Sequence, residues 1–279
     1  MLNPDPKPAF ELDLSDPGPI PEEAIEQAVA LMRTGRLHRY GEYAGTEPHA
    51  ALLEREYAEY VGSRYAIGIN SGGCAIFLGL KASGVEPGDR VLVNAFNLAP
   101  VPGAIHHAGA EAVLVEVDSD YRINLADLKS KARSSGAKTL LLTHMRGHIA
   151  DMDRVSALCD ELGLTLVEDC AHTMGAMWKG RFTGRFGAAG CFSTQTFKHI
   201  NSGEGGILVT DDDDIAARAI LFSGSYMLFG QHQSAPPQEV FDRWKMETPN
   251  FSMRMSHPVS YTHLRAHDTE RLISYAVFC

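Results

Sequence analysis

The feature that most constrains the fold is an alternation, from about residue 50 onward, of short apolar runs with segments of helical periodicity. The runs YAIGIN, DRVLVNAF, EAVLVEVD, KTLLLTH and LTLVEDC are rich in β-branched and leucine residues, and helical patterns such as DMDRVSALCDELG lie between them. This order is typical of crossover units, in which parallel strands are joined by helices that cover both faces of the sheet. The sequence therefore predicts an α/β fold with a mostly parallel sheet.

The alternation also predicts how the chain is organised. Residues 1–50 are rich in Pro, Gly and Glu, which predicts an N-terminal arm with one helix near PEEAIEQAVALMRTG. Residues 51–225 carry the alternation and end with the strand-like runs AAGCFST and GGILVTD and the helical DDDIAARAILFS. Residues 226–256 have no clear period and contain two tandem prolines, so we expect a loop region there.

Charge and cysteine content exclude several classes of protein. Acidic residues outnumber basic ones by 35 to 25, and Lys and Arg are scattered, so we expect neither nucleic acid nor an anionic membrane as a partner. The five cysteines lack metal-type spacing, and the N-terminus lacks the order of a signal peptide, which predicts a reduced, cytoplasmic protein. No apolar run approaches the roughly 20 residues that span a bilayer.

Candidate ligand-binding residues follow the strands, because ligands of open α/β sheets bind at the carboxyl ends of strands. After YAIGIN, Gly72 and Gly73 open a helix whose free backbone N–H groups suit a phosphate. A glycine turn without a ligand is the alternative. After LTLVEDC come Asp169 and His172, although a carboxylate there can simply cap the next helix.

Two more candidates, Ser193 and Lys198, follow the run AAGCF, and Lys198 precedes a glycine cluster. Surface lysines are common, so the combination carries the argument. Pyridoxal phosphate needs a lysine amine for its aldehyde, a carboxylate for its ring nitrogen, and N–H and hydroxyl donors for its phosphate. One cofactor thus accounts for four otherwise unrelated features.

The segment VEDCAHTMGAMWKGRFTGRFGAAGCFSTQTFKHINSGEGGILVT resembles the signature region of the DegT/DnrJ/EryC1/StrS aminotransferases. It contains an acidic pair, a His three residues on (where the family has Gln or His), a GxxxKGxxxGxxG stretch, and a Lys five residues past the Ser of an FS pair, followed by GEGG. The similarity runs from about residue 54 to about residue 225. It implies an aspartate-aminotransferase fold of type I, with a mostly parallel seven-stranded sheet in a pyridoxal-phosphate-binding large domain, 51–225.

By position, the resemblance implies a role for each candidate. Lys198 corresponds to the lysine that forms the Schiff base, and Asp169 to the partner of the pyridinium nitrogen. His172 corresponds to the residue near the phenolic oxygen. Gly72, Gly73 and Ser193 match the phosphate-binding positions.

Two departures from the family pattern affect the cofactor site. Where the family has Ser-Gly-Thr, this chain has SGGC, so the threonine hydroxyl is missing and Gly73 can offer only its backbone N–H. Where an aromatic residue stacks on the pyridine ring, NAFNLAP places Leu98, with Phe96 two residues earlier. Leu98 and Phe96 are therefore the candidates for contact with the ring.

The resemblance also implies an activity and partners. The expected reaction moves an amino group from an amino acid, typically L-glutamate, to the keto group of a nucleotide-linked sugar. The expected assembly is a homodimer in which Asn250 of the partner subunit helps to bind the phosphate. The alternatives are a pyridoxal-phosphate-dependent sugar dehydratase, whose relatives replace the lysine with histidine, and a non-catalytic cofactor-binding or regulatory protein.

Near NFSMRMS the family pattern stops, and residues 257–279 show neither the expected amphipathic helix nor a small-domain pattern. We therefore expect a truncated reading frame with a non-native tail, lacking the C-terminal small domain and possessing little or no activity. The alternatives are a divergent C-terminus and a metal cluster of His257, His263 and His267.

No metal site is predicted elsewhere. His144 and His148 have the spacing of helical metal ligands but follow a strand in a loop. The acidic run 211–214 lacks the alternating ligand positions of a calcium loop, so it predicts a helix start. Cys170 and Cys191 are expected to be core residues.

Overall fold

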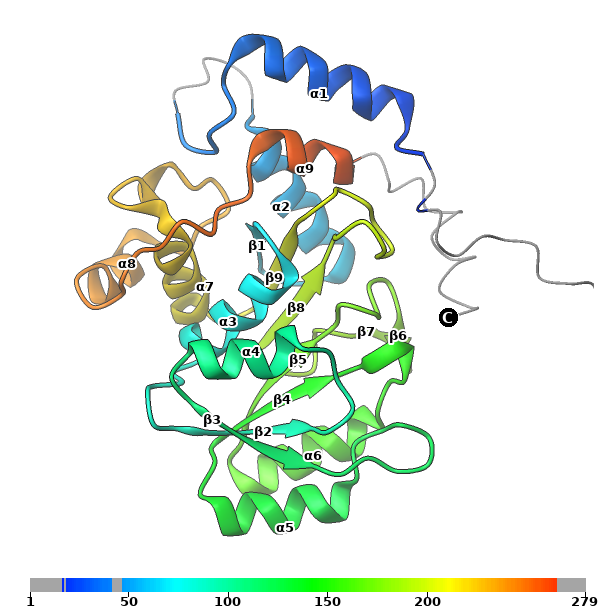
Figure 1. Cartoon of the computed structure of the whole chain (residues 1–279). Coiled ribbons are helices and arrows are strands. Elements are labelled where there is room, and N and C mark those ends of the chain that lie inside the picture. The colour runs from blue at the N-terminus through cyan, green and yellow to red at the C-terminus, as the bar shows by residue number, and fades with distance from the viewer. Residues whose placement is uncertain (1–16, 18, 42–46, 265–279) are drawn as a thin grey trace, which may run out of the picture.

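The computed structural model describes residues 17, 19–41 and 47–264. Its centre is a seven-stranded sheet in the order β1-β9-β8-β5-β4-β2-β3, drawn in Figure 1. The strands β2, β3, β4, β5 and β8 pair in parallel, and β9 runs antiparallel to both of its neighbours. The predicted α/β fold with a mostly parallel sheet is confirmed. The strands are β1 Tyr65–Ile69, β2 Arg90–Asn94, β3 Glu111–Val115, β4 Thr139–Thr143, β5 Thr165–Asp169, β8 Ala189–Ser193 and β9 Gly206–Thr210.

Helices cover both faces of this sheet (Figure 1). On one face α3 Gly72–Ala82, α4 Pro100–His107 and α7 Asp213–Ile220 form one core cluster with the sheet. On the other face α5 Leu125–Ser135 and α6 Met152–Leu162 cover the half of the sheet that contains β2 and β4, and α2 His49–Val61 covers β1, β8 and β9. The helix expected in the N-terminal arm is α1 Glu22–Thr34.

The strands read as continuous apolar runs because both of their faces are buried. Along β4, Leu140 and Leu142 pack in the cluster with α5 and α6, whereas Leu141 packs in the cluster with α3 and α4. Successive side chains of a strand point to opposite faces, so a two-sided core requires apolar residues along the strand.

Side-chain caps start several of the helices. In each case a side-chain oxygen accepts a hydrogen bond from a backbone N–H of the first turn, and the capping residues are Ser71, Asn124, Asp151 and Asp212.

A buried ion pair joins the segment after α1 to the rest of the protein. Arg39 donates two hydrogen bonds to the Glu54 carboxylate on α2, at 2.7 and 2.8 Å. The same carboxylate accepts a bond from the backbone N–H of Gly68 in β1, at 2.7 Å, and lies 3.2 Å from Nε2 of His232. Arg39, Glu54 and His232 are buried, so three segments that are distant in sequence meet at one carboxylate.

Two regions differ from the expectation of irregular structure near the C-terminus. Within 226–256, the structure contains the 3-10 turn Phe229–Gln231 and the helix α8 Gln238–Trp244, so the prediction of a loop was wrong there. The tandem prolines precede α8 rather than interrupt it, and Pro237 is its N-cap residue. Val240 and Phe241 are buried against the core, and this long-range packing stabilises the short helix.

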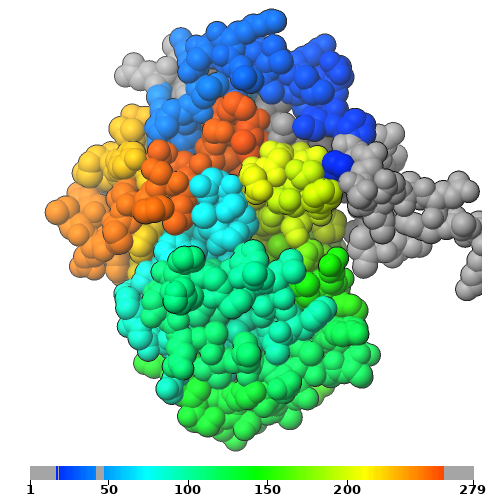
Figure 2. Space-filling view, viewed as in Figure 1, coloured from blue at the N-terminus to red at the C-terminus, as the bar shows by residue number. Residues whose placement is uncertain are grey.

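Residues His257–Leu264 form α9, a helix that the sequence did not predict. In the space-filling view, the segment that leads into α9 and α9 itself lie against the N-terminal helices (Figure 2). His257 is buried, and its Nδ1 lies 3.4 Å from the backbone N of Ala50 in α2. The side chains of His263 and His267 lie outside the described residues, and the origin of the tail stays a prediction.

In the sequence, a two-stranded hairpin, β6 Met177–Trp178 and β7 Arg181–Phe182, connects β5 to β8. It forms a sheet of its own and was not predicted. Within the described ranges, no helix combines the length and the apolar character needed to cross a membrane.

Candidate active site

A pocket opens at the carboxyl ends of the parallel strands, where the sequence placed its candidates. With its open mouth counted, it encloses about 400 Å³ of empty space. Leu98, Thr143 and Met145 line it together with six of the predicted site residues: Gly72, Gly73, Asp169, His172, Ser193 and Lys198. Strands β4, β5 and β8 are parallel neighbours, so the residues that follow them meet at one edge even though they are far apart in sequence.

Lys198, His172 and Asp169 form the polar centre of this pocket. Lys198 Nζ lies 2.8 Å from Nε2 of His172. Burial, the largest cause, lowers the pKa of the Lys198 amine; the charge of Arg146 lowers it further, and Asp169 opposes both. Burial also lowers the pKa of His172 to about 4, with added repulsion from Lys198, Arg146 and His199. The imidazole is therefore neutral near pH 7.

Asp169 ends β5 and is buried, with its Oδ1 accepting a hydrogen bond from the backbone N–H of Ala171 at 3.1 Å. Burial, the largest cause, raises the pKa of this carboxyl, and the hydrogen bond from the backbone N–H of Ala171 opposes the rise. A cationic ring nitrogen brought next to it would favour the carboxylate further. Burial alone thus favours the protonated form of Asp169, and a cationic partner would favour the charged carboxylate.

The phosphate-type turn is built by a close approach of backbones. Ser71 caps α3 through its Oγ, which accepts from the N–H of Cys74 at 3.1 Å. The N–H groups of Gly72 and Gly73 are in the first turn, which has no intrahelical acceptors for them. A Cβ on Gly72 would lie 2.6 Å from Cβ of Ser193, so only glycine lets this turn pack against the end of β8.

These residues fit pyridoxal phosphate by their donor chemistry. Two backbone N–H groups at a helix start and the Ser193 hydroxyl suit a phosphate. A buried carboxylate suits a ring nitrogen, and a lysine amine lies in the same pocket. Gly72 lets the helix start pack directly against Ser193, so the backbone N–H groups and the hydroxyl lie side by side.

The two candidates for ring contact are separated. Leu98 lines the pocket and is 40% exposed. Phe96 instead packs against Tyr121, with ring centroids 5.0 Å apart, and is not part of the lining. Of these two residues, Leu98 lines the pocket and Phe96 does not, and contact of either with a cofactor ring stays a prediction.

Asn250 does not line the pocket of its own chain. Its Oδ1 accepts a hydrogen bond from the backbone N–H of Tyr226 at 2.6 Å, and the residue is exposed. The expected role of Asn250 in a partner subunit stays a prediction.

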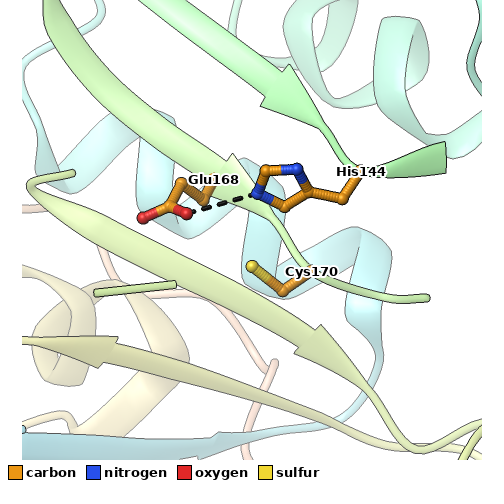
Figure 3. Close-up of side chains that lie close together, drawn as sticks. All are labelled: His144, Glu168 and Cys170. Carbon is orange, nitrogen blue, oxygen red and sulfur yellow. Dashed lines mark hydrogen bonds and ion pairs between the residues drawn. The ribbon is translucent and has the colours of Figure 1, made fainter. Parts of the chain in front are cut away.

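His144, Glu168 and Cys170 have donor atoms within 4.8 Å of one another, as metal ligands do (Figure 3). The Glu168 carboxylate is already fully used, because Oε1 accepts from the backbone N–H groups of Phe186 and Gly187, and Oε2 accepts from that of Gly184. Nε2 of His144 lies 3.3 Å from Oε2. Burial, with Glu168 and Asp169 nearby, raises the pKa of the Cys170 thiol, which disfavours the thiolate that a metal needs. We interpret this cluster as a structural anchor.

The other polar groups singled out in the sequence have structural partners. The ring of His148 packs on Tyr121, with centroids 5.4 Å apart. Asp212 caps α7, as predicted for a helix start. Cys170 and Cys191 are buried, and the prediction of core residues is confirmed.

The sequence did not predict that the turn after β4 contributes to the pocket. Met145 and Thr143 line the pocket, and the backbone N–H of Arg146 donates to Nδ1 of His172 at 3.4 Å. Arg146 has a left-handed backbone, with φ 55° and ψ 26°. The sequence indicated only that this turn follows a strand of the same sheet, and therefore lies at the edge where the other candidates lie.

Comparison with known proteins identifies the family of this chain. The profile of the DegT/DnrJ/EryC1/StrS aminotransferase family matches residues 20–259. The spore coat polysaccharide biosynthesis protein SpsC of Bacillus subtilis (strain 168) is 30% identical over 240 residues, which are 85% of this chain and 59% of that protein. The L-glutamine:scyllo-inosose aminotransferase of Streptomyces griseus is 34% identical over 199 residues, or 71% of this chain and 47% of that enzyme.

Among solved structures, DesV of S. venezuelae, in complex with a ketimine intermediate, superimposes with a TM-score of 0.75 at 28% identity. The match covers 91% of this chain and 62% of DesV. The present chain thus spans between about half and three-fifths of the length of these proteins.

Proposed function

Because the chain belongs to the DegT/DnrJ/EryC1/StrS aminotransferase family, we propose that it forms the cofactor-binding part of a pyridoxal-phosphate-dependent aminotransferase. The observation that carries the proposal is the single pocket in which Lys198, His172, Asp169, Ser193 and Gly72 meet. Family membership without this pocket would support the fold alone.

Each residue has a defined task in this proposal. The N–H groups of Gly72 and Gly73 and the Ser193 hydroxyl bind the phosphate. Asp169 holds a proton at the ring nitrogen, and Leu98 covers the ring. The bound cofactor supplies an aldehyde for the amine and a ring that stores an electron pair. Lys198 attaches the cofactor and, once displaced by the amino donor, moves the proton on the substrate carbon.

The proposed reaction transfers an amino group from an amino acid, with L-glutamate as the first donor to test, to a keto group of a nucleotide-linked sugar. The Streptomyces griseus relative is named an L-glutamine:scyllo-inosose aminotransferase, which supports an amino-acid donor. We propose a homodimer as the working assembly, with Asn250 of the partner subunit at the phosphate.

Reduction with borohydride tests cofactor attachment. We expect a visible absorption band after incubation with pyridoxal phosphate, and reduction should fix the label on Lys198, as found by peptide mapping. The variant Lys198→Ala should show neither the band nor the label, whereas Lys138→Ala should behave like the unmodified chain. A label on another lysine would contradict the proposal.

Amino transfer is tested separately with isotopically labelled glutamate and glutamine and a panel of keto-sugars and keto-inositols. Transfer of label to an acceptor supports the aminotransferase. Loss of a hydroxyl group from the sugar without gain of nitrogen would identify a dehydratase. Attachment at Lys198 without either reaction would identify a binding protein or a chain that needs further segments for catalysis.

A further inference from the structure

One hydrogen lies between Nζ of Lys198 and Nε2 of His172. Which nitrogen carries it bears on whether the lysine amine is charged or neutral. Nζ and Nε2 are 2.8 Å apart, so one nitrogen donates and the other accepts. If the imidazole accepts, the amine donates, and both an ammonium and a neutral amine can do so. If the imidazole donates, the amine must offer a lone pair and is therefore neutral.

The other nitrogen of the ring resolves this choice. The backbone N–H of Arg146 donates to Nδ1 of His172 at 3.4 Å. A backbone amide can only donate, so Nδ1 must carry the lone pair, and in a neutral imidazole the ring proton then resides on Nε2. The donor Nε2–H faces Nζ of Lys198.

Several elements of the fold contribute titratable groups around Lys198. His172 and Asp169 come from β5 and the turn after it, Arg146 from the turn after β4, and His199 from the segment that contains the lysine. Burial and Arg146 lower the pKa of the amine, and only Asp169 raises it. Burial, the largest cause, lowers the pKa of His172 to about 4, and the charge of Arg146 acts in the same direction, so the imidazole is neutral near pH 7.

We propose that the backbone amide of Arg146 fixes His172 as the Nε2–H tautomer, and that His172 thereby holds Lys198 as a neutral amine before the cofactor binds. His172 is then a positioning residue for cofactor capture, because a neutral amine is the form that reacts with an aldehyde. Only the part about cofactor capture rests on the proposed function, in which Lys198 attaches the cofactor. The tautomer and the state of the amine stand on the geometry alone.

The test measures the protonation of Lys198 in the cofactor-free protein. Lysines are labelled at a series of pH values with a low concentration of isotopic acetic anhydride, and each site is quantified by mass spectrometry. The exposed Lys138 in the same sample is the internal reference. We expect Lys198 to be labelled already at neutral pH, whereas the labelling of Lys138 should rise only at higher pH.

The variant His172→Gln replaces the ring with a carboxamide whose oxygen can accept a hydrogen bond from an ammonium, so the labelling curve of Lys198 should move to higher pH. His199→Gln is the matched control, since His199 adjoins Lys198 and the structure shows no hydrogen bond between their side chains; its variant should leave most of the shift in place. Nitrogen-15 NMR of the histidines checks the tautomer of His172 without any substitution.

Titration of Lys198 together with Lys138, or an Nδ1–H tautomer at His172, would overturn the inference. These results do not depend on cofactor binding. A protein with an early-titrating Lys198 that acquires no borohydride-stable cofactor would contradict the proposed function and leave the inference standing.

Discussion

Gly72 and Ser193 lie so close together that a Cβ on Gly72 would stand 2.6 Å from Cβ of Ser193 and 3.0 Å from its Oγ. Gly72 opens α3 and Ser193 ends β8, so this contact brings a helix N-terminus and a hydroxyl to one place. Gly73, one residue later, has open space, with Cβ of Pro100 as the nearest atom at 3.6 Å. The two adjacent glycines therefore have different structural roles.

The first prediction compares Gly72→Ala with Gly73→Ala. The alanine at position 72 must displace the end of β8, which should cost about 1–3 kcal/mol of unfolding free energy and weaken cofactor binding. The alanine at position 73 fits, so its variant should unfold like the parent. Urea denaturation and absorbance titration with pyridoxal phosphate measure both effects. Equal behaviour of the two variants would show that the close contact does not constrain the turn.

The second prediction concerns the hydroxyl that this chain lacks. Gly73→Thr should add a donor for the cofactor phosphate in space that is already open. One added hydrogen bond contributes about 0.5–1.5 kcal/mol, which corresponds to a dissociation constant roughly 2- to 10-fold lower. Gly73→Val has the same shape without the hydroxyl and should show no such gain. If valine tightens binding as much as threonine, packing rather than hydrogen bonding is responsible.

The third prediction removes the charge of Asp169. Asp169→Asn keeps the shape and should keep cofactor binding within roughly tenfold, while amino transfer falls by several orders of magnitude. The reason is that an unprotonated pyridine ring is a weaker electron acceptor, and each ~1.4 kcal/mol of lost transition-state stabilisation slows the reaction about tenfold. Single-turnover rates with glutamate, in a form of the protein that shows activity, check this. Near-parental rates would remove Asp169 from the assigned role.

The fourth prediction separates an anchor from a metal site at Glu168. Its carboxylate accepts backbone hydrogen bonds from Gly184, Phe186 and Gly187, so Glu168→Gln would place an amide donor against these donors. We expect a loss of about 2–4 kcal/mol in unfolding free energy. Chelators and added Zn²⁺ should leave the melting temperature of the unmodified protein unchanged. Stoichiometric zinc binding that Cys170→Ser abolishes would contradict the anchor.

The fifth prediction concerns the buried pair of Arg39 and Glu54. Arg39→Met leaves an uncompensated carboxylate and should cost about 3–5 kcal/mol at pH 7. The double variant Arg39→Met/Glu54→Gln should cost less than the sum of the single variants, because it removes the charge as well. Urea denaturation of the four proteins completes the cycle. Additive costs would show that the two side chains do not stabilise each other.

The same pair also predicts a pH dependence. Burial alone would raise the pKa of Glu54, but Arg39 and His232 outweigh it and hold this pKa below its ordinary value of 4.5. The stabilisation is therefore fully present above pH 4.5 and is lost progressively below it. The unfolding free energy of Glu54→Gln should fall less steeply than that of the parent between pH 4.5 and 3. Parallel slopes would contradict this linkage.

The composition of the candidate site could be predicted from the sequence because it depends on local order along the chain. Apolar runs such as LTLVEDC predict parallel strands, and residues directly after such strands share one edge of the sheet. This reasoning identified Gly72, Asp169, His172, Ser193 and Lys198, and the structure brings them into one pocket.

Contacts between segments that are distant in sequence depended on the tertiary structure. No spacing predicts that Arg39 pairs with Glu54, that Glu168 anchors residues 184–187, or that Val240 and Phe241 bury a helix in a proline-rich segment. The turn after β4 illustrates the same limit: its position was predictable, but the bond from Arg146 to His172 was not. Strand and helix periodicities report only local geometry, whereas hydrogen-bond partners and tautomers are decided by which buried groups meet when the chain packs.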